Sequence, residues 1–397
     1  MTQKKTIEDL NLQGRRVLVR VDFNVPIKNG VIGDDTRVRS SLPTIEYALA
    51  HGARAVILCS HLGRPKGKPD PQYSLKPVAD HLATLLEREV VFAEDCVGAP
   101  ATAAIERAGN GGVVLLENLR FHPEEEKNDA AFAAALAALA DVYVNDAFGS
   151  AHRAHASTEG IVHHVTEAAA GLLMAAEIEH LGRVLDRPDR PFVAILGGAK
   201  VSDKLEVIQN LIPRVDALLI GGAMAYTFFK ARNLPVGKSL VEPDLLDAAR
   251  EVETQAKARG LRLELPADHV VAPKLEAGAP AETLDVGDPA IGDRMGLDIG
   301  PKTVATYASV ITGAKTVIWN GPMGVFEIDA FAKGTMAVAD AVAGVTGTTV
   351  IGGGDSIAAV AKAGVTDRIT HISTGGGASL EFLGGRTLPG VAALPDR

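Results

Sequence analysis

The sequence contains little cysteine: Cys59 and Cys96 are the two examples in 397 residues. Two thiols cannot form a disulfide framework, and they predict a reducing, cytoplasmic environment. Cys59 ends an apolar run, so we interpret it as a small core residue. The sequence also lacks an apolar run of the roughly 18 residues that a membrane-spanning helix needs, and its first residues do not resemble a secretory signal. We therefore expect a cytoplasmic protein without a membrane partner.

Aromatic residues are scarce too, at 4%, and the formal net charge is −9. An acidic chain lacks the broad positive field that nucleic acids require, so we expect no nucleic-acid partner. Any anion site must then be a local concentration of cations. Glycine, in contrast, is abundant, with 41 residues. Many glycines and few aromatics are typical of an α/β protein with tight turns, and the length suffices for two domains.

Short aliphatic runs alternate with helical stretches along the chain. Such alternation predicts parallel sheets covered by helices on both faces. We therefore expect an α/β fold of two doubly wound, Rossmann-like domains, joined by a helix and with a cleft between them. Phe132, Leu136 and Leu139 form an apolar helical stripe that we assign to the core. The predicted strands are residues 17–21, 55–59, 113–116, 141–144, 192–196, 217–220, 316–319, 349–351 and 370–372.

The stretch 166–192 begins with good helix formers and ends in Pro188 and Pro191, where a helix cannot continue. We place the domain boundary there. The predicted parts are an N-terminal domain of residues 1–168, a connecting helix of 169–187 and a C-terminal domain of 188–384. We expect the tail from about residue 385 to 397 to pack back on the first domain. The acidic run 123–129 is interpreted as a solvated helix start.

Polar and charged residues follow the predicted strands of the first half. In open α/β sheets, ligands bind beyond the carboxyl ends of the strands. Arginine guanidinium groups at that edge can bind phosphate or carboxylate oxygens in a bidentate manner. Several of them together indicate that the ligand is a small polyanion. The residues concerned are Arg20, Asp22, Asn24, Arg37, His61, Arg64, Arg120, His152 and Arg153.

Glycines follow the predicted strands of the second half. Without a side chain, backbone N–H groups can approach a ligand closely, and the start of a following helix attracts negative charge. This pattern is typical of a nucleotide site. The glycines concerned are Gly197, Gly198, Gly221, Gly222, Gly321, Gly352 to Gly354 and Gly375 to Gly377.

Other functions fit the sequence less well. A dehydrogenase would need a glycine fingerprint after the first strand, which instead leads into Asp22 and Asn24. Gly237-Lys238-Ser239 matches the end of a phosphate-binding P-loop motif, but the first glycine of that motif would fall at position 232, which is Arg232. A non-catalytic phosphosugar-binding protein explains the arginines but not Lys200, Lys204 and Asp355 beside glycine-rich loops. His152 and His155 lack further ligands for zinc.

Long motifs in order along the chain resemble the phosphoglycerate kinase family from end to end. They include RVDFNVP (20–26), SHLGRP (60–65), LLENLRFH (115–122), NDAFGSAHRAH (145–155), LGGAKVSDK (196–204), WNGPMGVFE (319–327), GGGDS (352–356) and STGGGASLE (373–381). The resemblance implies reversible transfer of the acyl phosphate of 1,3-bisphosphoglycerate to ADP, giving 3-phosphoglycerate and ATP in glycolysis and gluconeogenesis. It further implies a monomer that uses Mg²⁺ with ADP or ATP, and direct in-line transfer on domain closure.

The resemblance also implies roles for individual residues. A phosphoglycerate site in the first domain would use Asp22, Phe23, Asn24, Arg37, His61, Leu62, Gly63, Arg64, Arg120 and Arg153. A nucleotide site in the second domain would use Lys204, Gly221, Gly222, Gly296, Asn320, Glu327, Gly352, Gly353, Gly354, Asp355 and Ser356. Catalysis would involve Arg37, Lys200, Lys204, Gly375 and Gly376, and Asp355 would hold the metal ion.

Overall fold

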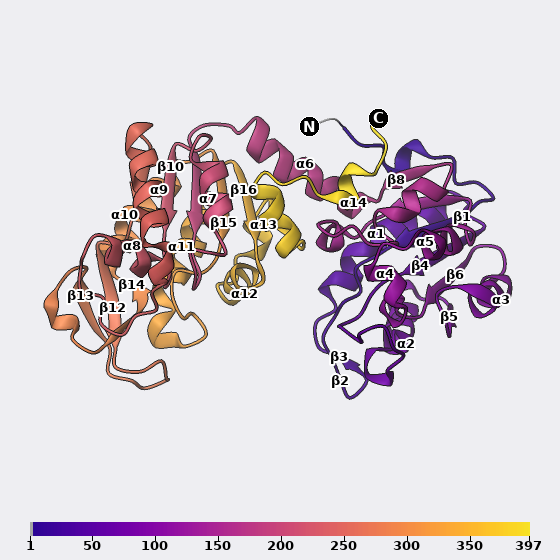
Figure 1. Cartoon of the computed structure of the whole chain (residues 1–397), viewed down its shortest axis with the longest axis horizontal. Coiled ribbons are helices and arrows are strands. Elements are labelled where there is room, and N and C mark those ends of the chain that lie inside the picture. Colours follow the sequence, from indigo (N-terminus) through magenta and orange to yellow (C-terminus); the bar gives the residue numbers. More distant parts are fainter. Residues whose placement is uncertain (1–2) are drawn as a thin grey trace. The chain divides into compact units, whose positions relative to one another are not determined.

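The computed structural model describes residues 3–397, which form two compact units. Unit 1 contains the described residues up to Glu179 together with Thr387–Arg397, and unit 2 contains His180–Arg386 (Figure 1). Across residues 3–397, no helix combines the length and the apolar character that crossing a bilayer would demand.

The centre of unit 1 is a six-stranded sheet in the order β5-β6-β4-β1-β7-β8, with every neighbouring pair parallel. The inner strands are buried on both faces, which explains their continuous aliphatic sequences. The strands are β1 (Arg16–Arg20), β4 (Ala55–Cys59), β5 (Val90–Ala93), β6 (Gly112–Leu116), β7 (Val142–Asn145) and β8 (Ala168–Ala170), and a separate hairpin pairs β2 (Ile27–Lys28) with β3 (Val31–Ile32).

Helices connect the parallel strands of unit 1, as right-handed crossovers require. They are α1 (Thr36–Ala50), α2 (Lys76–Leu86), α3 (Gly98–Ala108), α4 (Pro123–Glu126) and α5 (Ala130–Ala137), with α14 (Pro389–Ala392) from the C-terminal segment. That segment returns to the start of the chain. The backbone N–H of Lys5 donates to the carbonyl of Pro395 over 3.0 Å, and Asn145 Nδ2 donates to the carbonyl of Gly390 over 3.3 Å.

Unit 2 repeats the plan with a six-stranded parallel sheet in the order β11-β10-β9-β15-β16-β17. The strand order reverses between β9 and β15, the place where a crevice opens in a doubly wound sheet. The strands are β9 (Phe192–Leu196), β10 (Ala217–Ile220), β11 (Arg262–Glu264), β15 (Thr316–Asn320), β16 (Thr348–Gly352) and β17 (His371–Ser373).

A small antiparallel sheet in the order β13-β12-β14 lies at one end of unit 2 (Figure 1). It consists of β12 (Asp268–Ala272), β13 (Glu282–Asp285) and β14 (Met295–Ile299). The helices of the unit are α7 (Leu205–Leu211), α8 (Ala225–Ala231), α9 (Leu246–Ala258), α10 (Pro301–Thr312), α11 (Lys333–Ala343), α12 (Gly354–Lys362) and α13 (Gly377–Leu383), and α6 (Leu172–Asp186) runs from unit 1 into unit 2.

The structure confirms the predicted fold class and each predicted strand, with ends that differ by a residue or so. The apolar stripe of Phe132, Leu136 and Leu139 is buried, as expected. The strands β5, β8 and β11 and the small antiparallel sheet were not predicted. The predicted start of the connecting helix, residue 169, is wrong. Residues 168–170 pair with β7 as strand β8, and the helix begins at Leu172.

A buried carboxylate holds the first turn of α6. Asp146 follows β7, and its Oδ1 accepts hydrogen bonds from the N–H groups of Leu173 at 3.0 Å and Met174 at 3.2 Å. Gly171 permits this approach, because a Cβ there would lie 2.1 Å from Asp146 Oδ1. Asp146 Oδ2 is buried without a hydrogen-bond partner among residues 3–397. Burial raises the pKa of this carboxyl to about 7.

We predict that Asp146→Asn changes how stability depends on pH. Between about pH 4 and 7 the folded protein keeps a proton that the unfolded chain releases, so this carboxyl makes the protein less stable as pH rises. Asparagine does not titrate. The free energy of unfolding of the variant, minus that of the wild type, should therefore rise by roughly 3–4 kcal/mol from pH 4 to 8.

Urea unfolding at several pH values measures this difference, with Asp340→Asn on the exposed face of α11 as the control. A difference that stays constant across the range would show that Asp146 is ionised throughout in the folded protein.

Candidate functional site

Unit 1 gathers arginines beyond the carboxyl edge of its sheet. We call Arg20, Arg37, Arg120 and Arg153 the arginine group. Arg20 ends β1, Arg37 lies in the first turn of α1, and the other two follow β6 and β7. The charges of Arg20, Arg120 and Arg37 all act on the ring of His61, so these side chains surround one place. An edge so rich in positive charge suits a phosphate or carboxylate ligand.

The histidines of this edge do not add to its charge at neutral pH. Burial lowers the pKa of His61 well below its usual value, and the neighbouring arginines lower it further. Burial and the charges of Arg120 and Arg20 lower the pKa of His155 to about 4. Both rings are therefore neutral at pH 7 and offer hydrogen bonds, while the arginines supply the field.

Hydrogen bonds fix the positions of the groups around this edge. Arg37 donates to Asp22 Oδ2 over 2.8 Å. The N–H of Gly63 donates to Asn24 Oδ1 over 2.9 Å, and its carbonyl accepts from Arg120 over 2.9 Å. Gly63 has a φ of 60°, and a Cβ there would lie 2.4 Å from the Tyr73 ring. Residue 63, whose backbone binds both Asn24 and Arg120, must therefore be glycine.

The remaining predicted substrate residues differ in exposure. Phe23 and Leu62 are buried, so their side chains belong to the core and their backbone alone reaches the edge. Arg64 is exposed, and Arg153 is half-buried. Arg153 donates to His152 over 3.2 Å. The Nε of Arg120 is buried without a hydrogen-bond partner among the described residues, although Glu126 Oε1 lies 3.7 Å from it as an ion-pair partner.

Glu125 is a buried carboxylate beside this edge, contrary to the solvated position expected for it. The run 123–129 was expected to be solvated, but the Glu125 side chain is fully buried. Its carboxylate accepts hydrogen bonds from the N–H and the Oγ of Ser157 at 3.0 and 2.5 Å. Burial raises the pKa of Glu125, whereas the charge of Arg20 lowers it. This carboxylate partly balances Arg20, whose own Nε also donates to Ser157 Oγ over 2.8 Å.

We predict that Glu125→Gln destabilises the protein by about 1–3 kcal/mol, because a buried amide cannot accept both hydrogen bonds from Ser157 and cannot balance Arg20. Chemical denaturation at pH 7 measures the loss. Glu124→Gln, at the neighbouring half-buried position, is the control and should change stability little. Equal effects of the two substitutions would contradict the balancing role of Glu125.

The glycines of unit 2 meet where the strand order of its sheet reverses. Gly197 follows β9 and Gly321 follows β15, and a Cβ on Gly321 would lie 2.1 Å from the carbonyl oxygen of Gly197. The φ of Gly321 is 101°, a conformation that other residues rarely adopt. The N–H of Gly321 donates to the buried Ser356 Oγ over 2.6 Å. Glycine here brings two strand ends and the start of α12 together.

A polar cavity of about 370 Å³ lies at this place. Lys204 is buried in its wall and donates to Asn320 Oδ1. Burial lowers the pKa of Lys204, while Asp203 and Asp355 raise it. The predicted residues that line the cavity are Lys200, Lys204, Asn320, Gly353, Gly354, Asp355, Ser356 and Gly376, together with Gly377.

A second cavity of about 340 Å³ shares Gly198, Ala199, Pro322 and Asp355 with the first, so the two lie side by side. The predicted residues Gly222, Gly296 and Glu327 line it. Its walls are largely apolar, which suits a flat heterocycle better than a phosphate. The predicted residues Gly221, Gly352 and Gly375 line neither cavity. Gly352 packs against Asn320 behind the wall, and a Cβ at position 352 would lie 3.3 Å from Asn320 Nδ2.

Several residues that line this second cavity were not predicted from the sequence. Leu240 and Leu275 line it although their side chains are about half exposed, at 49% and 55%. Tyr226 Oη and His269 Nδ1 share a hydrogen bond of 2.7 Å, and a Cβ on Gly296 would overlap Tyr226. Asp298 also lines the cavity, and burial raises its pKa to about 7. His269 and Asp298 were not found because they lie on β12 and β14, which belong to an unpredicted sheet.

Asp355 fits the requirements of a magnesium ligand. Its carboxylate is exposed and lines both cavities. The N-cap of α12 is Gly353, so capping the helix does not explain Asp355. Asp203 lines the polar cavity as well. Mg²⁺ prefers one or two carboxylates completed by phosphate oxygens and water, which this wall can provide.

The fold and the two sets of strand-end residues define a class: a two-unit parallel α/β protein with an arginine-rich sheet edge in one unit and glycine-lined cavities in the other. The family model for phosphoglycerate kinase matches residues 7–386. The phosphoglycerate kinase of Moorella thermoacetica is 60% identical over 395 residues, covering 99% of this chain and 100% of that protein. The enzyme of Koribacter versatilis is 58% identical over 402 residues, with coverage of 99% and 100%.

A solved structure of phosphoglycerate kinase from Coxiella burnetii has a TM-score of 0.90 at 42% identity, covering 98% of each chain. The structure from Pyrococcus horikoshii has a TM-score of 0.83 at 35% identity, covering 99% of this chain and 98% of that one. The chain therefore belongs to the phosphoglycerate kinase family. It is an enzyme that reversibly transfers a phosphoryl group between 1,3-bisphosphoglycerate and ADP, a step of glycolysis and gluconeogenesis.

Proposed function

We propose that the two units divide the substrates of this reaction between them. The observation that supports this is the contrast between the arginine group of unit 1 and the glycine-lined cavities of unit 2. The arginine group, with Asp22, Asn24, His61 and Arg64, binds the phosphate and carboxylate of phosphoglycerate. The polar cavity takes the nucleotide phosphates and the apolar cavity takes the base and ribose, with Glu327 beside the ribose.

Mg²⁺ enters this proposal with the nucleotide. Asp355 would hold the ion, and the ion would neutralise charge on the nucleotide phosphates. Lys204 contributes its own charge from the wall of the same cavity, and its contact with Asn320 directs it inward. Lys200 lines the cavity too and is placed to act on the transferring group.

The chain's residues position the reactants and neutralise charge. The attacking atom is a phosphate oxygen of ADP or, in reverse, a carboxylate oxygen of 3-phosphoglycerate. Both are ionised at pH 7, so no general base is needed. In-line transfer then depends on holding the reactants in place. Arg37, Lys200, Lys204 and the backbone N–H groups near Gly375 and Gly376 supply the positive charge and donors that the transferring phosphoryl group requires.

Formation of ATP from 1,3-bisphosphoglycerate and ADP in a coupled assay tests the proposal directly, with titration of Mg²⁺ in the same assay. Activity without any dependence on Mg²⁺ would overturn the metal assignment. We also propose that the active form is a monomer, as the family resemblance implies. We also propose a cytoplasmic location, in keeping with the two reduced cysteines and with a glycolytic substrate.

We predict that Arg37→Ala lowers kcat by about 100-fold or more while weakening 3-phosphoglycerate binding much less. An interaction made mainly in the transition state appears in kcat. Arg37 is half-buried and held by Asp22, which suits such a role. Steady-state kinetics with both substrates measures the effect.

Arg39→Ala is the matched control, because Arg39 lies two residues further along α1 and pairs with Asp35 on the exposed surface. If Arg37→Ala instead raised KM and left kcat near normal, Arg37 would have a role in ground-state binding alone.

We predict that Asp355→Asn raises the Mg²⁺ concentration needed for half-maximal activity by about tenfold or more and leaves the affinity for 3-phosphoglycerate nearly unchanged. An amide is a far weaker ligand for Mg²⁺ than a carboxylate. Asp367→Asn, at an exposed position beyond α12, is the control. An unchanged Mg²⁺ requirement together with a lowered melting temperature would show that Asp355 stabilises the helix and does not bind the ion.

We further propose that binding of both substrates closes the units on each other. Transfer needs reacting atoms within roughly 3–3.5 Å, and the proposed sites belong to different units. The hinge would involve α6 and the segment near Gly375. Small-angle scattering should show a smaller radius of gyration with 3-phosphoglycerate and nucleotide together than with either alone. An identical radius in all states would contradict closure.

A further inference from the structure

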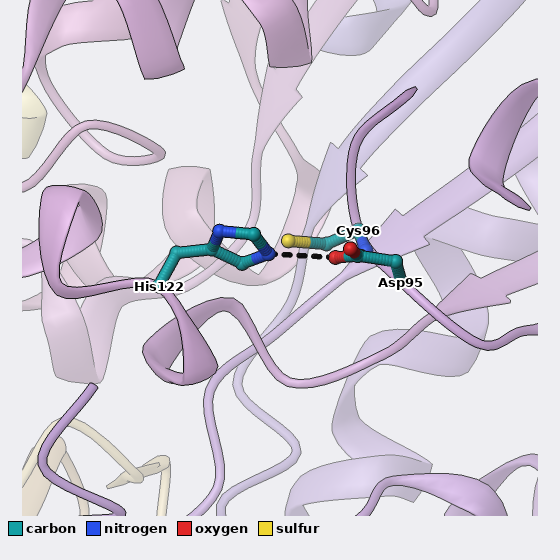
Figure 2. Close-up of side chains that lie close together, drawn as sticks. All are labelled: Asp95, Cys96 and His122. Carbon is teal, nitrogen blue, oxygen red and sulfur yellow. Dashed lines mark hydrogen bonds and ion pairs between the residues drawn. The ribbon is translucent and has the colours of Figure 1, made fainter. Parts of the chain in front are cut away.

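A cluster of potential metal ligands lies in unit 1 beside neighbouring strands β5 and β6, and the proposed reaction does not use it. Asp95 and Cys96 follow β5, and His122 follows β6 after a short 3₁₀ turn of Leu119–Phe121. Figure 2 shows the three side chains directed toward one another. One ligand atom from each lies within 4.8 Å of the others. His122 Nε2 and Asp95 Oδ1 are 2.7 Å apart.

An ion can reach the cluster from solvent, because two of its three side chains are partly exposed. The Cys96 side chain is fully buried and forms the floor, whereas the side chains of His122 and Asp95 are 29% and 39% exposed. Asp95 is held in place, because its Oδ1 also accepts the N–H of Cys96 over 2.7 Å. An ion arriving from solvent would meet the carboxylate and the imidazole first and the sulfur last.

The ligand types decide which ion would bind. Sulfur and imidazole nitrogen suit Zn²⁺ and related transition metals, whereas Mg²⁺ and Ca²⁺ prefer oxygen alone. Bonds of about 2.0–2.3 Å to zinc in a tetrahedron place ligand atoms roughly 3.3–3.8 Å apart. The 2.7 Å contact between Asp95 and His122 would open slightly, and Cys96 would move in by about 1 Å or less.

We propose that Asp95, Cys96 and His122 bind one divalent transition-metal ion of the Zn²⁺ class, with water as the fourth ligand. On binding, the Cys96 thiol loses its proton to solvent and its sulfur forms a bond to the metal. The proton that His122 Nε2 shares with Asp95 moves through solvent to Nδ1, so His122 coordinates through Nε2 as a neutral ring, and Asp95 exchanges its hydrogen bond to His122 for a bond to the ion. No electron is transferred in this step.

The bound ion would tie the loop after β5 to the segment that carries Arg120, two residues before His122. Burial and the charge of Asp95 raise the pKa of the Cys96 thiol. The metal must displace this proton, so its apparent affinity should rise about tenfold per pH unit for the one proton released. If His122 and Asp95 were an ordinary hydrogen-bonded pair and Cys96 an ordinary core residue, the protein would bind no metal here with an affinity that rises with pH.

Cobalt titration of the metal-free full-length protein tests the site, because a Co²⁺–thiolate bond has its own charge-transfer absorption. One equivalent should produce that band, and one equivalent of Zn²⁺ should remove it. Cys96→Ser should abolish the band, and His122→Gln should weaken Co²⁺ binding by at least about tenfold. The controls are Cys59→Ser and His81→Gln, which should leave the titration unchanged. Cys59 is the other buried thiol, and His81 forms a 2.9 Å pair with Asp35 but has no cysteine beside it.

The absence of a thiolate band in the wild type, or its survival in Cys96→Ser, would overturn the proposal. If Cys96→Ser does not fold, the more exposed His122 and Asp95 decide the matter. An unchanged titration in both His122→Gln and Asp95→Asn would equally overturn it.

Discussion

The structure of unit 1 depends on a concentration of positive charge at one edge of a parallel sheet. Arg20 ends the central strand and is fully buried, so its charge must be satisfied inside the protein. Ser157, the carbonyl of Val21 and the neutral ring of His61 accept or share its hydrogen bonds, and Glu125 supplies an opposing charge. Because that balance is incomplete, the edge retains a net positive field. If phosphoglycerate binds at this edge, as we propose, the anion completes the balance, and the stability of the edge and its affinity for the substrate then have one cause.

At the carboxyl edge of its sheet, unit 2 presents backbone where unit 1 presents charged side chains. Its strand ends approach so closely at Gly197 and Gly321 that a Cβ would overlap a carbonyl oxygen. The close approach leaves a wall made of backbone, and Lys204 adds charge from behind it. In the proposed division of substrates, side chains of unit 1 recognise a small ligand with defined charges, whereas bare backbone of unit 2 accommodates the phosphates and flat base of a nucleotide.

Sequence patterns predicted the elements that have one consistent environment. Strands such as β4 and β9, buried on both faces, appear as unbroken aliphatic runs, and the strand-end arginines and glycines follow directly from them. The pattern failed where tertiary contacts override it. Residues 168–170 are alanines with good helix propensity, yet pairing with β7 makes them a strand. Glu125 lies in an acidic run typical of solvated helices, yet Ser157 and Arg20, both distant in sequence, draw it inside. Tyr226 on α8 meets His269 on β12, a strand of the sheet that no periodicity predicts.

The cluster of Asp95, Cys96 and His122 extends the same argument. The carboxyl edge of a parallel sheet collects polar residues, because strands must end in loops and loops carry the groups that strands cannot bury. At β1, β4 and β7 this edge carries cations, and beside β5 it carries a thiol and a carboxylate facing an imidazole. The segment that follows β6 contributes one residue to each group: Arg120 belongs to the cations, and His122 belongs to the cluster with Asp95 and Cys96. An ion bound at His122 would therefore act on the segment that holds Arg120, and through it on the affinity for an anionic substrate.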